Sequence, residues 1–162
     1  MKIGYVSVRK IEEKYVGAVL IVDEFGIPQE FKYTEPVSPT PLQKILYGKS
    51  LDLYLTVEII AKSLLKNVEQ KPEIFLTDNI SLVESSDQVY YVSSHPATKP
   101  EQDQDSEPNE CVISSQTESL KFIAKSNFSQ DKVEKLKKIV EEFDVMEPFQ
   151  RLAKALEFVC RS

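Results

Sequence analysis

Two carboxylates are the side chains in this 162-residue sequence whose positions best suit chemistry. Asp78 follows the short apolar run of residues 74–76, which is typical of a buried strand, and the carboxyl ends of such strands face ligand crevices in open α/β sheets. Glu58 lies midway along a mostly apolar helical segment, where a charge is costly unless it reaches water or a partner. Each also has a purely structural interpretation, since Asp78-Asn79 is common turn chemistry and Glu58 fits the exposed edge of its helix. We take Asp78 and Glu58 as the candidate catalytic residues.

Patterns for several other reactions are missing from the sequence. The four glycines do not cluster, so there is no dinucleotide-binding or phosphate-loop fingerprint. The single histidine, His95, begins a polar segment that we expect to be mobile, and nucleophilic catalysis with Ser94 or Cys111 needs groups that are held rigidly. One histidine and two distant cysteines, Cys111 and Cys160, also do not make a zinc pattern.

The first third of the chain predicts strands. Residues 15–22 are almost continuously apolar, as in a central strand that is covered on both faces. Residues 3–9 are rich in β-formers, and residues 29–33 alternate aromatic and charged side chains. Gly26 supplies the positive φ that a tight turn between the last two strands requires. We therefore predict a three-stranded antiparallel meander.

Helices and further strands follow the meander. Thr40, Pro41 and Gln43 form a capping-box helix start, and a longer helix is predicted from residue 50 to about residue 67. Further strands are predicted near 74–77, 88–92 and 120–124, and two C-terminal helices near 129–143 and 148–160. The predicted fold class is α/β (mixed α+β). Its central mixed sheet has about five to six strands, opens with the antiparallel meander, and packs against one long helix and the two C-terminal helices.

Charge is concentrated in one segment of what we predict to be a single domain spanning residues 1–162. Residues 95–117 contain five acidic residues and one basic residue, which is −4 of the net charge of −6. We predict that this segment is a flexible acidic loop inserted before the last strand and the two C-terminal helices. Because Lys and Arg form no stripe elsewhere, the charge distribution argues against nucleic acid as a partner. The absence of a long apolar run or signal peptide predicts no membrane partner and a cytoplasmic location.

The order of elements resembles the opening of the ribonuclease H-like fold over about residues 1–80. The residues that carry the resemblance are 15–23, 31–34, Glu58 and 74–79. The resemblance implies that an Asp on the first strand, a Glu on the helix and an Asp after the fourth strand hold divalent metal ions. Glu58 and Asp78 match this pattern, whereas residues 2–9 contain no acid. Three or four carboxylates are needed around two cations, so Asp23 or Asp87 would have to supply a further ligand.

Three functions follow from these observations. Elimination favours a non-catalytic intracellular interaction or regulatory module over an enzyme, without a cofactor and with a protein partner or a second copy of the chain. The acidic loop and the C-terminal helix are its expected contact regions. The first alternative is a nuclease or phosphodiesterase that depends on Mg²⁺ or Mn²⁺, with Asp78, Glu58 and Asp23 as candidate metal ligands. The second alternative is a small-molecule-binding α/β domain that uses the crevice at the strand ends.

Overall fold

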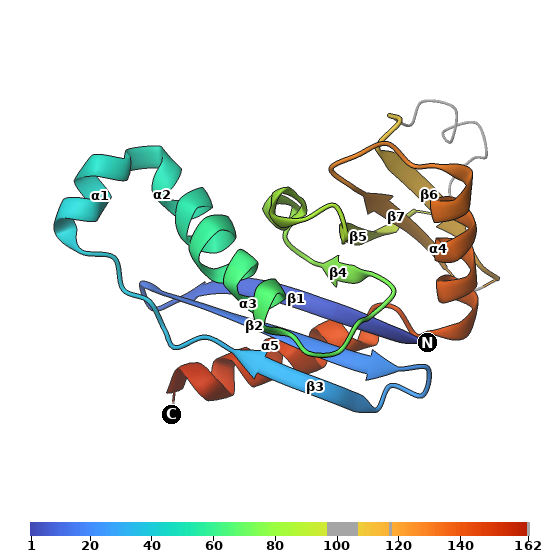
Figure 1. The fold of residues 1–162 in the computed structure, drawn as a ribbon, viewed down its shortest axis with the longest axis horizontal. Helices are drawn as coiled ribbons and strands as arrows, with labels where there is room; N and C mark the ends of the chain where they lie inside the picture. Colours follow the sequence, from blue (N-terminus) through green and yellow to red (C-terminus); the bar gives the residue numbers. More distant parts are fainter. Residues whose placement is uncertain (97–106, 117, 162) are drawn as a thin grey trace.

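The chain folds around a mixed β-sheet with helices on both faces (Figure 1). A computed structural model describes residues 1–96, 107–116 and 118–161, and within these ranges the sheet has seven strands in the order β3-β2-β1-β4-β5-β7-β6. β1 pairs antiparallel with β2 and parallel with β4, and β4 pairs parallel with β5. The strands are β1 (Lys2–Ile11), β2 (Lys14–Asp23), β3 (Pro28–Tyr33), β4 (Phe75–Thr77), β5 (Val89–His95), β6 (Glu110–Ser114) and β7 (Ser119–Ile123).

The predicted mixed α/β class is confirmed, with a strand count slightly higher than expected. The unexpected strand is β6, which lies inside the segment 95–117 that we predicted to be a loop. Its residue Ile113 is buried opposite Leu120 of β7 and ends a short apolar run, residues 111–113, that lies within a polar composition. The most acidic part of the predicted loop, residues 97–106, lies outside the described residues.

Helices were predicted at nearly the right positions. The capping box is confirmed, because Thr40 Oγ1 accepts from the Gln43 N–H at 3.1 Å and Gln43 Oε1 accepts from the Thr40 N–H at 2.9 Å. The predicted long helix is present over residues 51–67 and passes without a break from an α segment through a π segment to a second α segment. The helical elements are α1 (Pro41–Tyr47), η1 (Gly48–Ser50), α2 (Leu51–Leu53), the π-helix η2 (Tyr54–Ala61), α3 (Lys62–Asn67), η3 (Ile80–Ser85), α4 (Gln130–Glu142) and α5 (Glu147–Arg161). None of the described helices is both long and apolar enough to cross a membrane.

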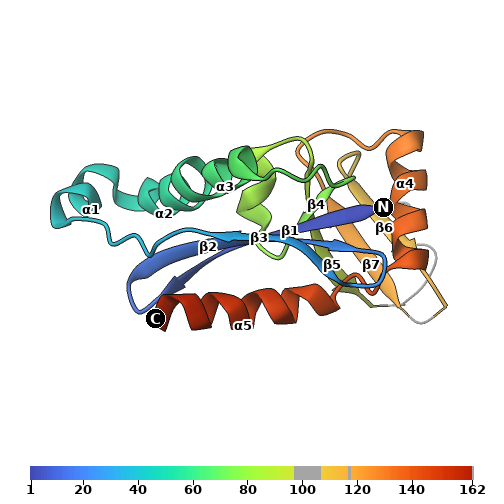
Figure 2. The ribbon, with the colours of Figure 1, turned by 60° about the horizontal axis from the view of Figure 1, so that its bottom comes forward.

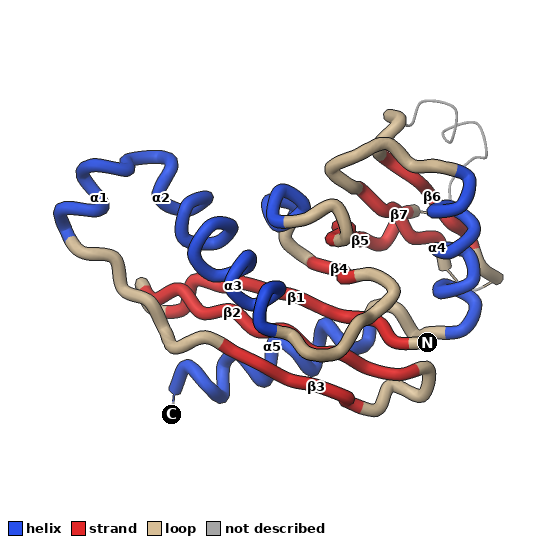
Figure 3. Tube along the Cα trace, viewed as in Figure 1, coloured by secondary structure: helices blue, strands red, loops and turns tan. Residues whose placement is uncertain are grey.

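The two faces of the sheet have different helical covers (Figures 2 and 3). One face, called here the η2 face, packs against α2, η2, α3 and η3, and Val6 and Val8 of β1 point to it. The other, called here the α5 face, packs against α4 and α5, and Ile3 and Tyr5 of β1 point to it. Because successive side chains of a strand alternate between faces, the position of any residue on β1 assigns it to one of these two covers.

Close approach of the helical cover to the sheet depends on Gly17 in β2. A Cβ atom at this position would lie 2.3 Å from Ile60 Cγ2 and 3.0 Å from Leu64 Cδ1. Gly17 pairs with Val8 in the sheet, so both residues face η2 and α3. The missing side chain lets the helix that carries Glu58 lie directly on the strand.

A carboxylate anchors the end of α3 to the edge strand β3. Burial alone would raise the pKa of Glu30, but the N–H groups of Gln70 and Glu69 donate to its carboxylate at 2.8 and 3.0 Å, and Lys32 Nζ lies 3.5 Å away. These donors favour the charged form and hold the pKa of Glu30 below its usual value. Glu30 thereby ties the exit of the helix to β3.

Replacing Glu30 with Gln is expected to remove a stabilisation that depends on pH. Because the folded-state pKa is lowered, this stabilisation is complete above the unfolded-state pKa of about 4.3 and is lost as the pH falls through the folded-state pKa. Melting temperatures of the wild type and Glu30→Gln from pH 7 to pH 3 should therefore converge at the acidic end. Glu69→Gln is the control, because that side chain is 85% exposed. A difference in melting temperature between the wild type and Glu30→Gln that stays constant from pH 7 to pH 3 would contradict the lowered pKa of Glu30.

Candidate functional site

Asp78 lies where β4 ends beside the middle of β1. In the parallel register Thr77 is opposite Val6, so the next residue of β1, Ser7, is beside Asp78. Ser7 Oγ donates to Asp78 Oδ1 at 2.9 Å, and Arg9 Nη2 donates to Asp78 Oδ2 at 2.7 Å. Ser7 is buried, whereas the side chains of Asp78 and Arg9 are 27% and 42% exposed. We call these three residues the Asp78 cluster.

Local sequence explains why the cluster forms at this point. Asn79 Oδ1 accepts from the Ser81 N–H at 3.0 Å and caps η3, so the chain leaves the sheet directly after Thr77. Ser7 and Arg9 are two residues apart on β1 and share the α5 face with Tyr5. Asp78 therefore meets a hydroxyl and a guanidinium on this face of the sheet.

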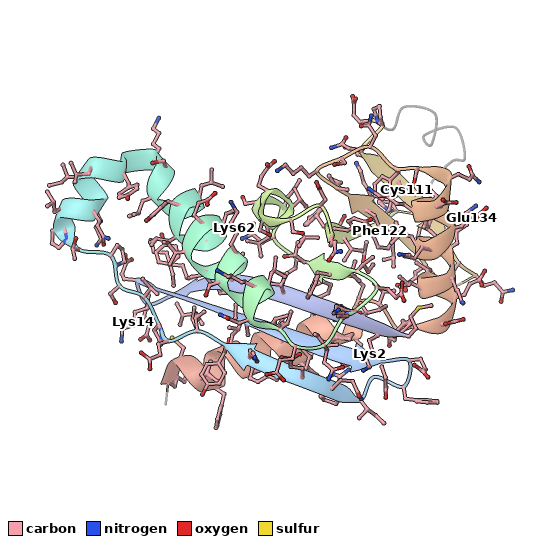
Figure 4. The ribbon with its side chains drawn as sticks, viewed as in Figure 1. Lys2, Lys14, Lys62, Cys111, Phe122 and Glu134 are labelled. Atoms are coloured by element: carbon pink, nitrogen blue, oxygen red, sulfur yellow. The ribbon has the colours of Figure 1, made fainter. Side chains whose placement is uncertain are left out.

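Glu58 lies on the opposite side of the sheet from the Asp78 cluster. It belongs to η2, whose buried residues cover the η2 face. Its own carboxylate is 52% exposed and pairs with Lys62 Nζ at 2.9 Å, one helical turn further along. Figure 4 labels Lys62 on this helix. Glu58 is thus one partner of a solvent-exposed i,i+4 ion pair. The structure does not bring its carboxylate close to that of Asp78.

Asp23 is far from the Asp78 cluster. It pairs with Lys2 at the start of β1, and Ser7 is five residues further along that strand. At about 3.3 Å per residue, the separation is about 17 Å. The carboxylate of Asp23 instead accepts from the N–H groups of Phe25 and Ile27 at 2.9 and 3.0 Å and shapes the β2–β3 turn.

A divalent metal centre of the kind that the resemblance implies does not fit these residues. Asp87, the remaining carboxylate considered, accepts from Ser126 Oγ at 3.1 Å. Within residues 1–96, 107–116 and 118–161, no three His, Cys, Asp or Glu side chains come together so that they could hold a metal ion. Asp78 already has a cation beside it in Arg9, and a second cation there would be repelled.

Sequence reasoning missed Ser7 and Arg9. The absence of an acid from residues 2–9 was noted, but the residue that replaces it was not identified. The sequence signal that could have identified them is the alternation of side chains along a strand, which places Tyr5, Ser7 and Arg9 on one face of β1. The register between β1 and β4 was needed to show that this face meets Asp78.

An open hollow elsewhere in the structure bears on the small-molecule alternative. It has a volume of about 780 Å³ and lies between β6 and α4, three strand positions from β4. The side chains that line it include Val112, Ile113, Ser114, Lys137, Val140 and Glu141. This hollow does not contain Asp78, so it is not the crevice at the strand ends that the small-molecule alternative would use.

Comparisons with known proteins give likeness of fold but no family. No protein-family model matches the chain, and no curated protein matches its sequence. Endonuclease V from Ciona intestinalis, in complex with a DNA that contains inosine, has 13% identity and a TM-score of 0.48, with 98% of this chain and 86% of that chain covered. Endonuclease V from Bacillus subtilis has 11% identity and a TM-score of 0.44, with coverage of 82% and 68%. Argonaute from Marinitoga piezophila, in complex with a guide RNA, has 12% identity and a TM-score of 0.45, and this chain covers only 25% of it.

These likenesses support one expectation from the sequence and overturn another. The weak ribonuclease H-like likeness is confirmed at the level of the fold, without a specific family. The expectation that nucleic acid is not a partner is contradicted, because the matched structures include complexes with DNA and with guide RNA. Charge summed over segments reports non-specific attraction, whereas specific contacts to nucleic acid need only a few placed side chains. At identities of 11–13%, what these proteins bind and the activities in their names are properties of those proteins.

Proposed function

We propose that this chain is a ribonuclease H-like domain that works by binding and does not carry out two-metal hydrolysis. The observation that supports the proposal is the separation of its carboxylates. Glu58 lies on the η2 face and pairs with Lys62, whereas Asp78 meets Ser7 and Arg9 on the α5 face. The cytoplasmic location expected from the sequence stays a prediction.

Two-metal hydrolysis requires a compact set of carboxylates. The two cations of such sites lie about 3.5–4 Å apart and are neutralised by acids that surround both of them. In this chain one acid and one base share the end of β4, and the helix carboxylate lies on the far side of a sheet layer. The local charge at the strand end is therefore near zero before any metal arrives.

The direct test is an assay that separates binding from cleavage. Single-stranded and double-stranded DNA and RNA are the first ligands to test, and fluorescence anisotropy would report binding while gel analysis reports products. We expect no products in millimolar Mg²⁺ or Mn²⁺, for the wild type and for Asp78→Asn alike. Glu58→Gln is the matched control, because its carboxylate lies on the other face. Metal-dependent cleavage by the wild type that disappears in Asp78→Asn would overturn the proposal.

A metal-dependent nuclease is the second candidate. The proteins named in the comparisons favour it, and Asp78 has the position that the ribonuclease H-like resemblance implies for an acid after the fourth strand. This function would require Arg9 to release Asp78 and further acids to reach the strand end. The same assay distinguishes the two candidates, because only the nuclease forms products that depend on both metal and Asp78.

A further inference from the structure

We infer that Arg9 is a resident cation that takes the place of a metal ion at Asp78. The inference deepens the proposed function and rests on it, because it explains how the strand end stays charge-balanced without a divalent ion. Two side chains on the same face of β1 carry it, namely the hydroxyl of Ser7 and the guanidinium of Arg9, on a strand where the resemblance implies an acid.

The geometry of the Asp78 cluster matches this role. Each carboxylate oxygen of Asp78 has one donor, Ser7 on Oδ1 and Arg9 on Oδ2. Among the described residues, Arg9 has no other ion-pair partner, and the closest residue of β1 to Asp78 carries no charge. The carboxylate is therefore neutralised by one permanent positive charge.

Chemistry makes the arginine and a metal ion mutually exclusive at this carboxylate. A guanidinium is protonated at every pH that the folded protein withstands, so this cation does not dissociate as a metal ion does. A divalent ion bound to Asp78 would lie within a few ångströms of Arg9 and would be repelled by it. With a hydroxyl at Ser7, the strand end also lacks the second carboxylate that would offset this repulsion.

Restoring the implied pattern is expected to create a metal site. The double substitution Ser7→Asp with Arg9→Gln removes the cation and places two carboxylates on neighbouring strands. At a Mn²⁺ concentration tenfold above the dissociation constant, the melting temperature of this variant should rise by about 3 °C. Calorimetric titration with Mn²⁺ alone should give one site per chain. The wild type and the matched control Lys62→Gln, which breaks the exposed ion pair on the η2 face, should show no rise.

A second variant keeps the test decisive if the buried position of Ser7 does not accept a carboxylate. Arg9→Glu changes only a half-exposed side chain and also sets two carboxylates beside the Ser7 hydroxyl. A Mn²⁺-dependent rise in either folded variant supports the inference. No rise in both folded variants would overturn it, as would a rise in the wild type that Asp78→Asn removes.

Failure of this inference is distinguishable from failure of the proposed function. If the variants gain no metal site while the wild type cleaves no nucleic acid, the role of Arg9 is wrong and the proposed function stands. If the wild type cleaves nucleic acid without any metal-dependent rise at Asp78, the proposed function is wrong and the role of Arg9 stands.

Discussion

Replacing Tyr5 with Ala is expected to lower the free energy of unfolding by about 4 kcal/mol. Tyr5 is fully buried on the α5 face, and its ring meets Phe149 edge-on at a centroid distance of 4.9 Å. Its hydroxyl donates to the carbonyl oxygen of Val145 at 2.7 Å, in the connection between α4 and α5. Burial raises the pKa of this hydroxyl, with Asp144 adding to the effect, so the group stays protonated and remains a donor.

Urea unfolding of two further variants separates the contributions of Tyr5. Tyr5→Phe keeps the ring and loses only the donor, which should cost about 1–3 kcal/mol because the Val145 carbonyl is left without its partner. Tyr33→Ala removes a tyrosine that is 54% exposed and should cost less than about 1 kcal/mol. A Tyr5→Ala variant as stable as Tyr33→Ala would show that the α5 face is not packed as described.

Replacing Gly17 with Ala is expected to destabilise the chain by about 2 kcal/mol and to lower its melting temperature by about 4–8 °C. The new Cβ would lie 2.3 Å from Ile60 Cγ2, so either the helix must move away from β2 or the side chain of Ile60 must change its conformation. Thermal unfolding of the single variant measures this cost directly.

A compensating substitution tests the cause of that loss. Ile60→Leu removes the Cγ2 atom that the new Cβ would meet, so the double variant Gly17→Ala with Ile60→Leu should recover part of the lost stability. Gly4→Ala is a comparison variant from another part of the sheet, because its new Cβ would lie 2.5 Å from the ring of Phe75 and not beside Ile60. Strictly additive losses in the Gly17 and Ile60 double variant would contradict direct contact between helix and strand at this point.

The sequence predicted the central elements because their signals are local. The apolar run of residues 15–22, the capping box at Thr40 and the apolar run before Asp78 each reflect short-range rules, and the structure has an element at each. β6 was missed because its apolar run is only three residues long and lies in an acidic segment. Strands with a strong local pattern could therefore be predicted from the sequence. β6 could not, because its evidence is its pairing with β7.

The candidate site was harder to predict, because it depends on register and on faces. Asp78 was identified from its position at a strand end, but its partners Ser7 and Arg9 are about 70 residues away in the chain. Glu58 was paired with Asp78 by resemblance, and the packing of η2 against Val6 and Val8 shows that its helix covers the other face. Non-local pairing of this kind leaves no periodic trace in one sequence.

The most direct test of the central claim is a titration of isotope-labelled wild-type protein with Mn²⁺, followed by amide NMR spectra. A paramagnetic ion bound at the end of β4 would broaden the amide signals of Thr77, Asp78 and Asn79 first. The proposed function predicts no selective loss of these signals at Mn²⁺ concentrations up to the millimolar range, because Arg9 already neutralises Asp78. Selective broadening at residues 77–79 that is absent in Asp78→Asn would contradict it and would show that this strand end binds a divalent metal.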